Sequence, residues 1–376
     1  MFKRKFLLFL SKLISFVIPT QKKLLVFHSS PDFADNSYAV FKYLLDIKKC
    51  KNYRYCWLFN KPSEIDKRIL SELEQLVNKG FDVKFVKRLS FKGLFYLYRC
   101  RYVFYTVGLY SSISFRQNDK RINLWHGMPI KSISSSICGG DITLATSEKF
   151  ATLMSNSLNI PEENVLLTGL PRNDLMFHTE FLSKDFEYLK NVSNVGIWMP
   201  TFRRSPSLIH KDGEFRENCI SFVKIEELEK LNEVLQRNDA LLIIKLHPYD
   251  VLQLKEFATY SNIIFLKNNN FLQKDMYPLL GCCDYLISDY SSVVIDFEIL
   301  GRPIGITLDN IEEYKNTRGL NTEHIPGTYL YDTNDLVNFI ESSLIHKYID
   351  HSYGTTYNLH KDNHSTERLL SILKII

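Results

Sequence analysis

Two histidines follow apolar, strand-like runs at the points where those runs end. His126 stands after "INLW" and before Gly127, and His247 stands after "LLIIKL" and before Pro248. An imidazole exchanges a proton near neutral pH, and a glycine beside it leaves room for a substrate to approach. We therefore expect His126 to act as a general base and His247 to donate to a phosphoryl oxygen, although a lone histidine after a strand more often has a structural role.

Residue types that bind phosphate follow two further strand-like runs. "SDYSS", residues 288–292, opens a helical run, where unpaired backbone N–H groups and the helix dipole attract an anion; helix capping alone would explain any single one of these residues. The guanidinium of Arg203 can form forked hydrogen bonds to a phosphate, although a single arginine is usually solvated or ion-paired. Asp296, about one turn into the helix, is expected to orient the nucleotide by accepting hydrogen bonds from ribose hydroxyls, with a plain polar position near the helix start as the alternative. The candidate donor and phosphate ligands are Thr201, Arg203, Ser288, Ser291, Ser292 and Asp296.

A second group of polar residues follows strand-like runs nearer the N-terminus. "PRND", residues 171–174, comes directly after "VLLTGL", and Lys131 follows His126 closely enough to neutralise charge beside it. In a doubly wound fold, ligands bind beyond the carboxyl ends of the strands, so this recurrence of polar residues at strand ends is the strongest physical signal in the sequence. The candidate acceptor-side or secondary residues are Gly127, Lys131, Arg172, Asn173 and Asp174.

Strand-like and helix-like runs alternate along the whole chain. Uninterrupted apolar runs such as "LLVF", "LLIIKL" and "DYLI" are typical of parallel strands that are buried on both faces. Strands separated by helices predict βαβ units. We therefore expect an α/β protein with two doubly wound Rossmann-like domains, 23–190 and 191–345, preceded by a basic helix at 1–22 and followed by a closing helical region at 346–376.

Positive charge is concentrated at the N-terminus. The 376 residues carry a net charge of +5, and residues 1–23 alone contribute +6, so the remainder carries about −1. This distribution argues against a nucleic-acid partner. The apolar stretch 6–18 is shorter than the roughly 20 residues that a membrane-spanning helix needs. We expect an amphipathic helix that lies on an anionic membrane surface, with packing on its own domain as the alternative.

Residues 79–123 combine ten Lys/Arg with eleven Phe/Tyr. Basic residues interleaved with aromatic ones occur in proteins that bind single-stranded nucleic acid and in surfaces that rest on lipid headgroups. Since no nucleic-acid motif accompanies them, lipid is the better collective interpretation, and many of the individual rings are expected to be core residues of strands.

The seven cysteines show neither a CxxC pair nor the spacing of zinc ligands. Several lie within apolar runs. We therefore expect reduced thiols in the core of a cytosolic protein and no metal site.

Five ordered motifs, "LWHGMPIK", "TGLPRND", "MPTFR", "KLHP" and "ISDYSSVVIDFEILGRPI", resemble those of the CDP-glycerol glycerophosphotransferase family, which builds teichoic-acid and related capsular polymers. "SSPDFADNSYAVFKYLL" and "EEYKNTRGL" are similar to its pattern as well, so the resemblance covers roughly residues 24–320. It implies a GT-B fold with two Rossmann-like domains facing a central cleft, no metal and no cofactor. It also implies a peripheral protein on the cytoplasmic face of a bacterial membrane.

The resemblance further implies a reaction. A polyol phosphate, glycerol phosphate in the first place, passes from CDP-glycerol or CDP-ribitol to a hydroxyl of a membrane-linked glycan or polymer, and CMP leaves. His126 takes the acceptor proton, while His247, Arg203 and the N–H groups around Ser291 and Ser292 hold the pyrophosphate. The motifs do not distinguish glycerol from ribitol phosphate.

Three features bear on how the resemblance is applied. Met128 replaces the usual threonine-like residue after "WHG", and "SSPDFAD" is not the commonest form of the first loop; both concern acceptor recognition. The chain lacks the long N-terminal extension of polymerising members, which favours a primase-type enzyme that adds one unit.

Two other interpretations remain open. A GT-B glycosyltransferase that uses a nucleotide sugar would share the fold and release a nucleoside diphosphate instead of CMP. A membrane-surface partner of a polysaccharide assembly or export machine, with a decayed site, would not catalyse a reaction. The presence of both histidines, Arg203 and the serine cluster argues against decay.

Overall fold

The computed structural model describes most of the chain. The described residues are 17–47, 50–60, 67–106, 120–130, 140–200, 219–246, 259–266, 272–308, 311, 325–347 and 353–376. Four of the predicted site residues lie outside these ranges, namely Lys131, Thr201, Arg203 and His247. Most of the predicted N-terminal helix, residues 1–16, also lies outside them.

The chain divides into two compact units, each built on one parallel sheet. The first unit comprises residues 1–126, 134–174 and 362–376, and its sheet has the strand order β3-β2-β1-β4-β5-β6-β7. The strands are β1 Leu24–His28, β2 Arg54–Phe59, β3 Asp82–Lys87, β4 Tyr102–Tyr105, β5 Lys120–Asn123, β6 Ile142–Leu144 and β7 Val165–Leu166. The helices are α2 Asp35–Asp46, α3 Lys67–Asn78, α4 Phe91–Arg99, α5 Glu148–Leu158, α6 Pro171–Asp174 and α12 Ser365–Ile372.

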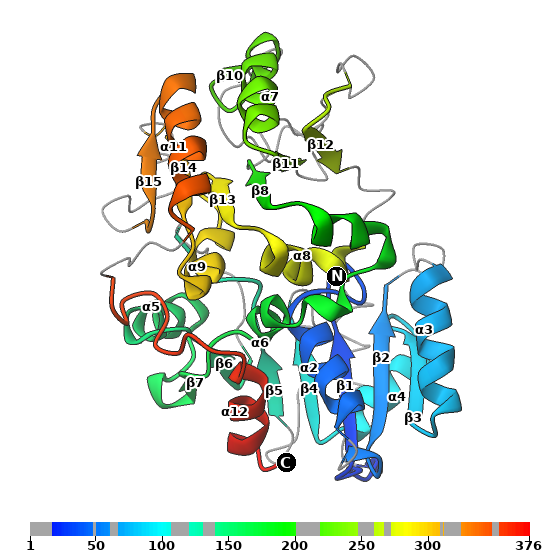
Figure 1. Ribbon diagram of the computed structural model, residues 1–376. Helices are drawn as coiled ribbons and strands as arrows, with labels where there is room; N and C mark the ends of the chain where they lie inside the picture. Colours follow the sequence, from blue (N-terminus) through cyan, green and yellow to red (C-terminus); the bar gives the residue numbers. More distant parts are fainter. Residues whose placement is uncertain are drawn as a thin grey trace, which may run out of the picture. The chain divides into compact units, whose positions relative to one another are not determined.

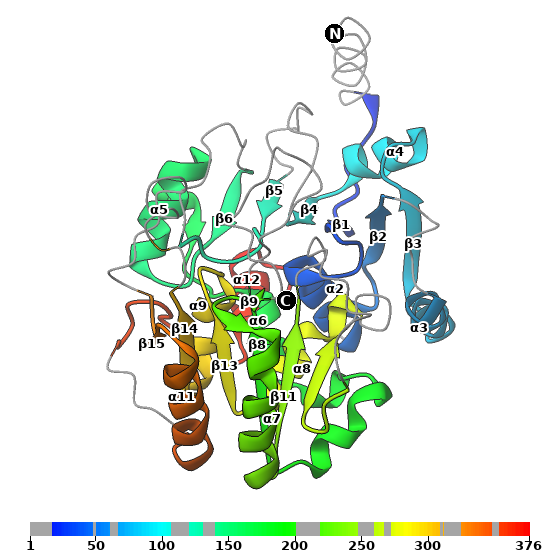
Figure 2. The same cartoon turned by 90° about the horizontal axis from the view of Figure 1, so that it is seen from above.

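Both faces of the first sheet are covered, as uninterrupted apolar strands require. On one face Phe27 of β1 and Trp57 of β2 pack against Phe41 of α2, with ring centroids 5.2 and 5.3 Å from that of Phe41. On the other face Leu24 and Val26 belong to a cluster that includes α4. Figure 2 shows α2 and α4 on opposite sides of β1 and β2.

The last helix of the chain belongs to the first unit. The helix α12, drawn in red in Figure 1, lies beside α6 and α2. The Asp174 carboxylate accepts hydrogen bonds from the backbone N–H groups of Ser365 and Thr366, at 3.0 and 2.8 Å, and so satisfies free donors at the start of α12.

The second unit comprises residues 127–133 and 175–361, and its sheet has the order β12-β11-β8-β13-β14-β15. Its strands are β8 Asn194–Met199, β11 Ala240–Lys245, β12 Ile263–Leu266, β13 Tyr285–Ser288, β14 Ile304–Thr307 and β15 Thr328–Leu330, with a separate hairpin of β9 Cys219–Ile220 and β10 Val223–Lys224. Its α-helices are α7 Leu228–Arg237, α8 Met276–Cys282, α9 Val293–Phe297 and α11 Thr333–Ile345. Figure 2 shows α7 and α11 together on one face of the sheet and α8 on the other.

The two parallel sheets with helices on both faces confirm the predicted α/β class and the doubly wound architecture. The chain passes from the first unit to the second at Asp174–Leu175, so the stretch 175–190, which the sequence places in the first domain, belongs to the second. Within that stretch Phe186 and Leu189 are buried. The region 346–376, expected as one closing segment, is divided as well, because residues 353–361 lie in the second unit and 362–376 in the first.

Cys50, Cys56, Cys100 and Cys283 are buried thiols that form no disulfide, and Cys219 and Cys282 are partly buried thiols that form no disulfide. Burial raises the pKa of the Cys283 thiol well above its usual value, which keeps it protonated and inert. In the described ranges, no helix combines the length and the apolar content needed to cross a membrane.

Candidate active site

His126 lies on a constrained turn after β5, at the carboxyl edge of the first sheet. Trp125, directly before it, has φ +56°, a left-handed conformation that a bulky L-residue rarely adopts. Gly127, directly after it, has φ +122°, which favours glycine. Backbone strain of this kind costs about 1–3 kcal/mol per residue and persists only where surrounding contacts enforce it. The sequence suggests that a glycine at position 127 gives a substrate access to His126. The structure adds a second reason, because the backbone there has a positive φ that glycine adopts easily.

His126 is a solvent-exposed residue, and protein atoms nevertheless fill much of the space around its ring. It lies against the Trp125 ring, with centroids 4.4 Å apart and planes inclined by 32°, and it hydrogen-bonds the backbone of Thr106 at the end of β4. The surrounding protein lowers the pKa of His126, chiefly through desolvation; Asp35 opposes this effect and Arg172 adds to it. The neutral imidazole, which is the form a general base needs, therefore predominates at neutral pH.

Asp35 and Arg172 form an ion pair near His126. Arg172 donates from Nη1 to Asp35 Oδ1 at 2.9 Å, and both side chains are largely buried. Asp35 has φ +62°, and its Oδ1 also accepts from the N–H of Asn36 at 2.8 Å. The pair places one positive and one negative charge beside the imidazole, and the effects of these charges on its pKa oppose each other.

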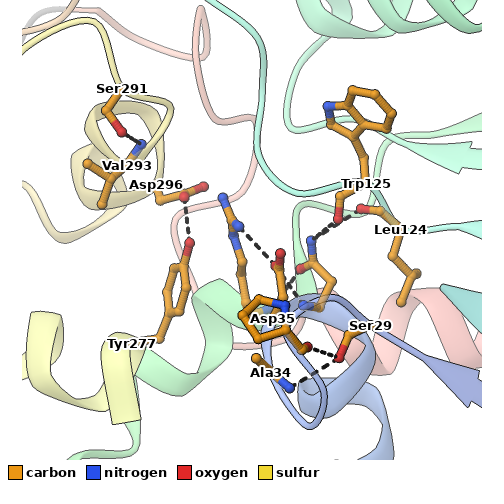
Figure 3. A network of polar contacts seen from close by, with 12 residues as sticks. Ser29, Ala34, Asp35, Leu124, Trp125, Tyr277, Ser291, Val293 and Asp296 are labelled. Carbon is orange, nitrogen blue, oxygen red and sulfur yellow. Dashed lines mark hydrogen bonds and ion pairs between the residues drawn. The ribbon is translucent and has the colours of Figure 1, made fainter. Parts of the chain in front are cut away.

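Asn36 connects three segments of the first unit. Its Nδ2 donates to the carbonyl oxygens of Leu124 and Trp125, at 3.2 and 3.0 Å, and its Oδ1 accepts from the N–H of Arg172 at 3.0 Å. Figure 3 shows the cluster around Asp35, with Leu124 and Trp125 reached by dashed lines. The turn that carries His126 is thus attached to the start of α2.

The three residues of "PRND" that were expected at the site have different surroundings. Arg172 lies close enough to His126 to affect its pKa, as a secondary site residue would. Asn173 is buried, and neither amide atom has a hydrogen-bond partner among the described residues. Asp174 holds the start of α12, and burial raises the pKa of its carboxyl despite those hydrogen bonds. These hydrogen bonds give Asp174 a structural role at the start of α12.

In the second unit the predicted donor segments follow three adjacent strands. All three strands are parallel. From β8 the chain adds β11 and β12 on one side and then β13, β14 and β15 on the other, so the strand order reverses between β8 and β13, and doubly wound sheets bind ligands at such a point. Residues 201–203 come shortly after β8, His247 follows β11, and "SDYSS" begins at the last residue of β13. Ser288 is buried and donates from Oγ to the carbonyl of Met199 at 2.7 Å, joining the ends of β13 and β8.

Ser291 and Ser292 lie at the start of α9 and are partly exposed. Ser291 Oγ accepts from the N–H of Val293 at 3.5 Å, and the side chain of Ser292, the N-cap residue, makes no capping hydrogen bond. Asp296 is fully buried, and its Oδ2 accepts from the hydroxyl of Tyr277 at 2.8 Å (Figure 3). The contact of Asp296 with ribose hydroxyls stays a prediction.

Sequence reasoning missed four residues that shape these two edges: Asp35, Asn36, Thr106 and Tyr277. The first two stand in "SSPDFADNSYAVFKYLL", where a polar pair opens a helix directly after a strand-like run, and that signal was available. The contributions of Thr106 and Tyr277 come from tertiary packing. Among the described residues, no group of three or more His, Cys, Asp and Glu side chains has a metal-binding arrangement.

Relatives of known function share most of the chain. It is 26% identical over 365 residues to the teichoic acid poly(glycerol phosphate) polymerase of Bacillus spizizenii, covering 88% of this chain and 86% of the relative. It is 23% identical over 398 residues to the teichoic acid ribitol-phosphate primase of the same organism, covering 96% of this chain and 93% of the relative. Because a polymerase is matched over nearly its full length, chain length does not favour a primase over a polymerase.

Solved structures show the same fold. The wall teichoic acid polymerase TagF, as its H548A variant, superposes with a TM-score of 0.71 at 20% identity and covers 95% of this chain and 89% of that one. A UDP-GlcNAc 2-epimerase from Methanocaldococcus jannaschii superposes with a TM-score of 0.53 at 11% identity and covers 94% of this chain and 99% of that one. These likenesses confirm the predicted GT-B type.

The family model for CDP-glycerol:poly(glycerophosphate) glycerophosphotransferases matches residues 10–374, nearly the whole chain. The five motifs of the sequence all lie within that match. The chain therefore belongs to the CDP-glycerol:poly(glycerophosphate) glycerophosphotransferase family.

Proposed function

We propose that this enzyme transfers a polyol phosphate from a CDP-polyol to a hydroxyl of a membrane-linked polymer in teichoic acid or capsular polysaccharide synthesis, with glycerol phosphate as the first candidate and ribitol phosphate as the second. Family membership supports the reaction class. The observation that carries the proposal is the His126 turn, which presents an exposed histidine of lowered pKa at the carboxyl edge of a parallel sheet.

In this reaction the acceptor hydroxyl oxygen attacks the phosphorus that bears the polyol. A new P–O bond forms to the acceptor, the pyrophosphate P–O bond breaks, and CMP leaves with the bonding electron pair. His126 takes the hydroxyl proton, a contribution that is typically about 10²–10⁴-fold in rate. The hydrogen bond from the imidazole to the Thr106 backbone leaves its other ring nitrogen available for that proton.

The second unit is proposed to hold the CDP-polyol. Thr201 and Arg203 follow β8 and Ser291 and Ser292 follow β13, the two strands that flank the reversal of strand order, and His247 follows the neighbouring strand β11. Cationic and N–H donors there would bind the pyrophosphate and stabilise charge as CMP departs, which is the larger share of catalysis in phosphoryl transfer. The hydrogen bond from Tyr277 to Asp296 joins α8 to α9, whose N-cap residue is Ser292.

The acceptor is proposed to approach the first unit. Arg172 of this unit and Lys131, five residues after His126 in the sequence, carry positive charge, which suits a polymer that is itself a chain of phosphodiesters. Of the two departures from the family pattern, the first loop, "SSPDFAD", belongs to this unit, and Met128 belongs to the second. These residues are the places to look for acceptor preference.

Peripheral attachment to an anionic membrane is the final part of the proposal. At the start of α4 the side chains of Leu89 and Phe91 are 68% and 90% exposed, and Phe95 one turn later is 42% exposed. Lys92 and Arg99 lie on the same helix, so apolar and cationic groups occur together. The segment before β1 lies beside the end of this helix, because the Gln21 N–H donates to the Arg99 carbonyl at 2.7 Å. Cosedimentation with phosphatidylglycerol vesicles, lost in a Phe91→Ser/Phe95→Ser variant, would test this attachment.

The reaction class is tested by nucleotide release. Purified enzyme is offered CDP-glycerol, CDP-ribitol and a panel of UDP- and GDP-sugars, with a membrane extract as acceptor. Release of CMP from one CDP-polyol would identify the reaction and the donor together. Release of UDP or GDP from a sugar donor would be compatible with the fold and would overturn the assignment as a polyol phosphate transferase.

A further inference from the structure

The backbone around His126 requires an external support. Trp125 at φ +56° lies outside the broad region open to L-residues, so this turn is not the conformation the isolated segment would prefer, whereas glycine accommodates the φ of +122° at position 127. Two local hydrogen bonds contribute: Leu124 N–H donates to the Tyr105 carbonyl at 2.8 Å, and Trp125 N–H donates to Asn123 Oδ1 at 3.1 Å. Both bonds involve backbone N–H groups that come before the N–Cα bond of Trp125, whose φ is positive. They do not hold the carbonyl groups of the turn.

The carbonyl side of the turn is held by the side-chain amide of Asn36, which is distant in the sequence. Asn36 Nδ2 donates to the carbonyls of both Leu124 and Trp125, and Asn36 itself is fully buried. Two carbonyl partners and one N–H partner fix which end of the amide is nitrogen, because only Nδ2 can donate and only Oδ1 can accept from Arg172 N–H. Each of these bonds lies in a water-poor setting, where an unmade bond costs about 1–3 kcal/mol.

The same amide sets the spacing between the turn and the charged pair. Asn36 follows Asp35 directly, and its Oδ1 holds the backbone of Arg172, so the Asp35–Arg172 pair and the Trp125 carbonyl share one anchor. Among the described residues of the first unit, Asp35 and Arg172 are the charged groups that act on the pKa of His126. A change at Asn36 therefore alters the imidazole's place relative to its neighbours without removing a charge.

We propose that Asn36 is a positioning residue for catalysis: its amide clamps the Leu124–Trp125 carbonyls to the start of α2 and thereby holds His126 in the orientation needed for proton abstraction. The proposal deepens the proposed function and rests on the role of His126 in it. Misplacement of a catalytic group by about 1 Å costs on the order of 10²-fold in rate, so the expected effect is large although Asn36 does not touch substrate.

The decisive variant is Asn36→Asp, which keeps the size and the acceptor for Arg172 N–H and replaces the donor by an oxygen that repels the two carbonyls. We expect kcat with the preferred CDP-polyol to fall about 10²-fold, with KM for the donor within about twofold of the wild-type value. The matched control is Ser37→Ala. Ser37 is the next residue of α2 and is as buried as Asn36. In the wild type its hydroxyl donates to the His28 carbonyl at 2.8 Å, and the alanine variant loses this bond, which does not involve the His126 turn. We expect its kcat within about threefold of wild type.

A cycle with His126→Ala separates positioning from general damage. If Asn36 acts through His126, Asn36→Asp adds no further loss in the His126→Ala background. An equal loss in both backgrounds, or an equal loss in Ser37→Ala, would overturn the proposal. Near-normal activity of His126→Ala alone would instead overturn the proposed general base, which is a distinguishable result.

Folding is checked by the thermal midpoint and by donor binding in calorimetry. If Asn36→Asp fails these checks, Asn36→Ala supplies the test, because it removes the donor without a buried charge. A folded Asn36 variant that binds donor and turns over at the wild-type rate would contradict the proposal.

Discussion

The two edges that the reaction needs are built in different ways. In the first unit the His126 turn is strained and depends on side-chain bonds from a helix far away in the sequence, since Asn36 and Trp125 are 89 residues apart. In the second unit the donor segments leave three neighbouring parallel strands, and Ser288 joins two of the strand ends to each other by a hydrogen bond to backbone. One edge is set by individual side chains and the other by sheet topology.

This difference indicates where each edge is sensitive to mutation. A group held by one amide loses its orientation when that amide changes, while the unit around it remains folded. A set of segments that leave adjacent strands is disturbed mainly when the strands themselves are disturbed. Substitutions in the first unit should therefore separate catalysis from stability more cleanly than substitutions in the second.

The largest expected effect comes from the two histidines. His126→Ala and His247→Ala should each reduce CMP release by about 10²–10⁴-fold, because one removes the base and the other a donor to the phosphoryl oxygen. Circular dichroism should show both variants folded. Activity within tenfold of wild type in either variant would remove that residue from the mechanism.

The sheet of the second unit is tested by Gly196→Ala in the central strand β8. A Cβ at Gly196 would overlap ring carbons and the hydroxyl oxygen of Tyr285, which is fully buried on the adjacent strand. Overpacking of this kind should lower the free energy of unfolding by about 3 kcal/mol, measured by urea denaturation. Gly80→Ala in the first unit is the control for a change at glycine without a clash, since a Cβ there would meet no atom within 4 Å, although the φ of +88° adds some backbone strain. Equal midpoints for Gly196→Ala and wild type would contradict the packing described for β8 and β13.

Lys245, the last residue of β11, gives a pH dependence of stability. Burial lowers the pKa of its ammonium from 10.5 to about 8. Between these values the unfolded chain keeps a proton that the folded protein has released, so the free energy of unfolding should rise as pH rises from 8 to 10.5, by about 3 kcal/mol. Lys245→Met should remove this rise. Parallel stability curves for wild type and variant across that interval would contradict it.

The smallest expected effect is a pair of opposite shifts in the pH profile of kcat/KM. Activity should fall as pH drops through the pKa of His126, which lies below 6.5. Asp35→Asn removes the carboxylate that raises this pKa and should move the inflection to lower pH. Arg172→Gln removes the cation that lowers it and should move the inflection to higher pH. Shifts in the same direction would contradict the opposing charges described for the pair.

The sequence predicts the sheets well because their signals are local. Runs such as "LLIIK" of β11 and "YLIS" of β13 are apolar without interruption, and polar residues mark where each run ends. The same signals place His126 and "SDYSS" at carboxyl edges. The unit boundary was predicted less well, because the polar stretch after residue 174 resembles a linker while Phe186 and Leu189 in it are buried in the second unit.

The supports of the site are the part that sequence patterns do not reveal. Asn36 and Leu124 are 88 residues apart, and nothing local at either position indicates that they bond. Asp174 was expected among the site residues because it follows a strand, yet it caps a helix that begins 191 residues later. Such contacts depend on tertiary packing, which the period of apolar residues does not encode.

The proposed mechanism assigns the general base, His126, to the first unit and donor binding to the second. Isothermal titration of CDP-glycerol, or of CDP-ribitol if that is the donor that releases CMP, into wild type, His126→Ala and Arg203→Ala tests it most directly. We predict that His126→Ala binds the donor with a Kd within about twofold of wild type while it fails to release CMP, and that Arg203→Ala binds at least about tenfold more weakly, because it loses a forked pair of hydrogen bonds to phosphate. Loss of donor binding in His126→Ala with unchanged binding in Arg203→Ala would contradict the account.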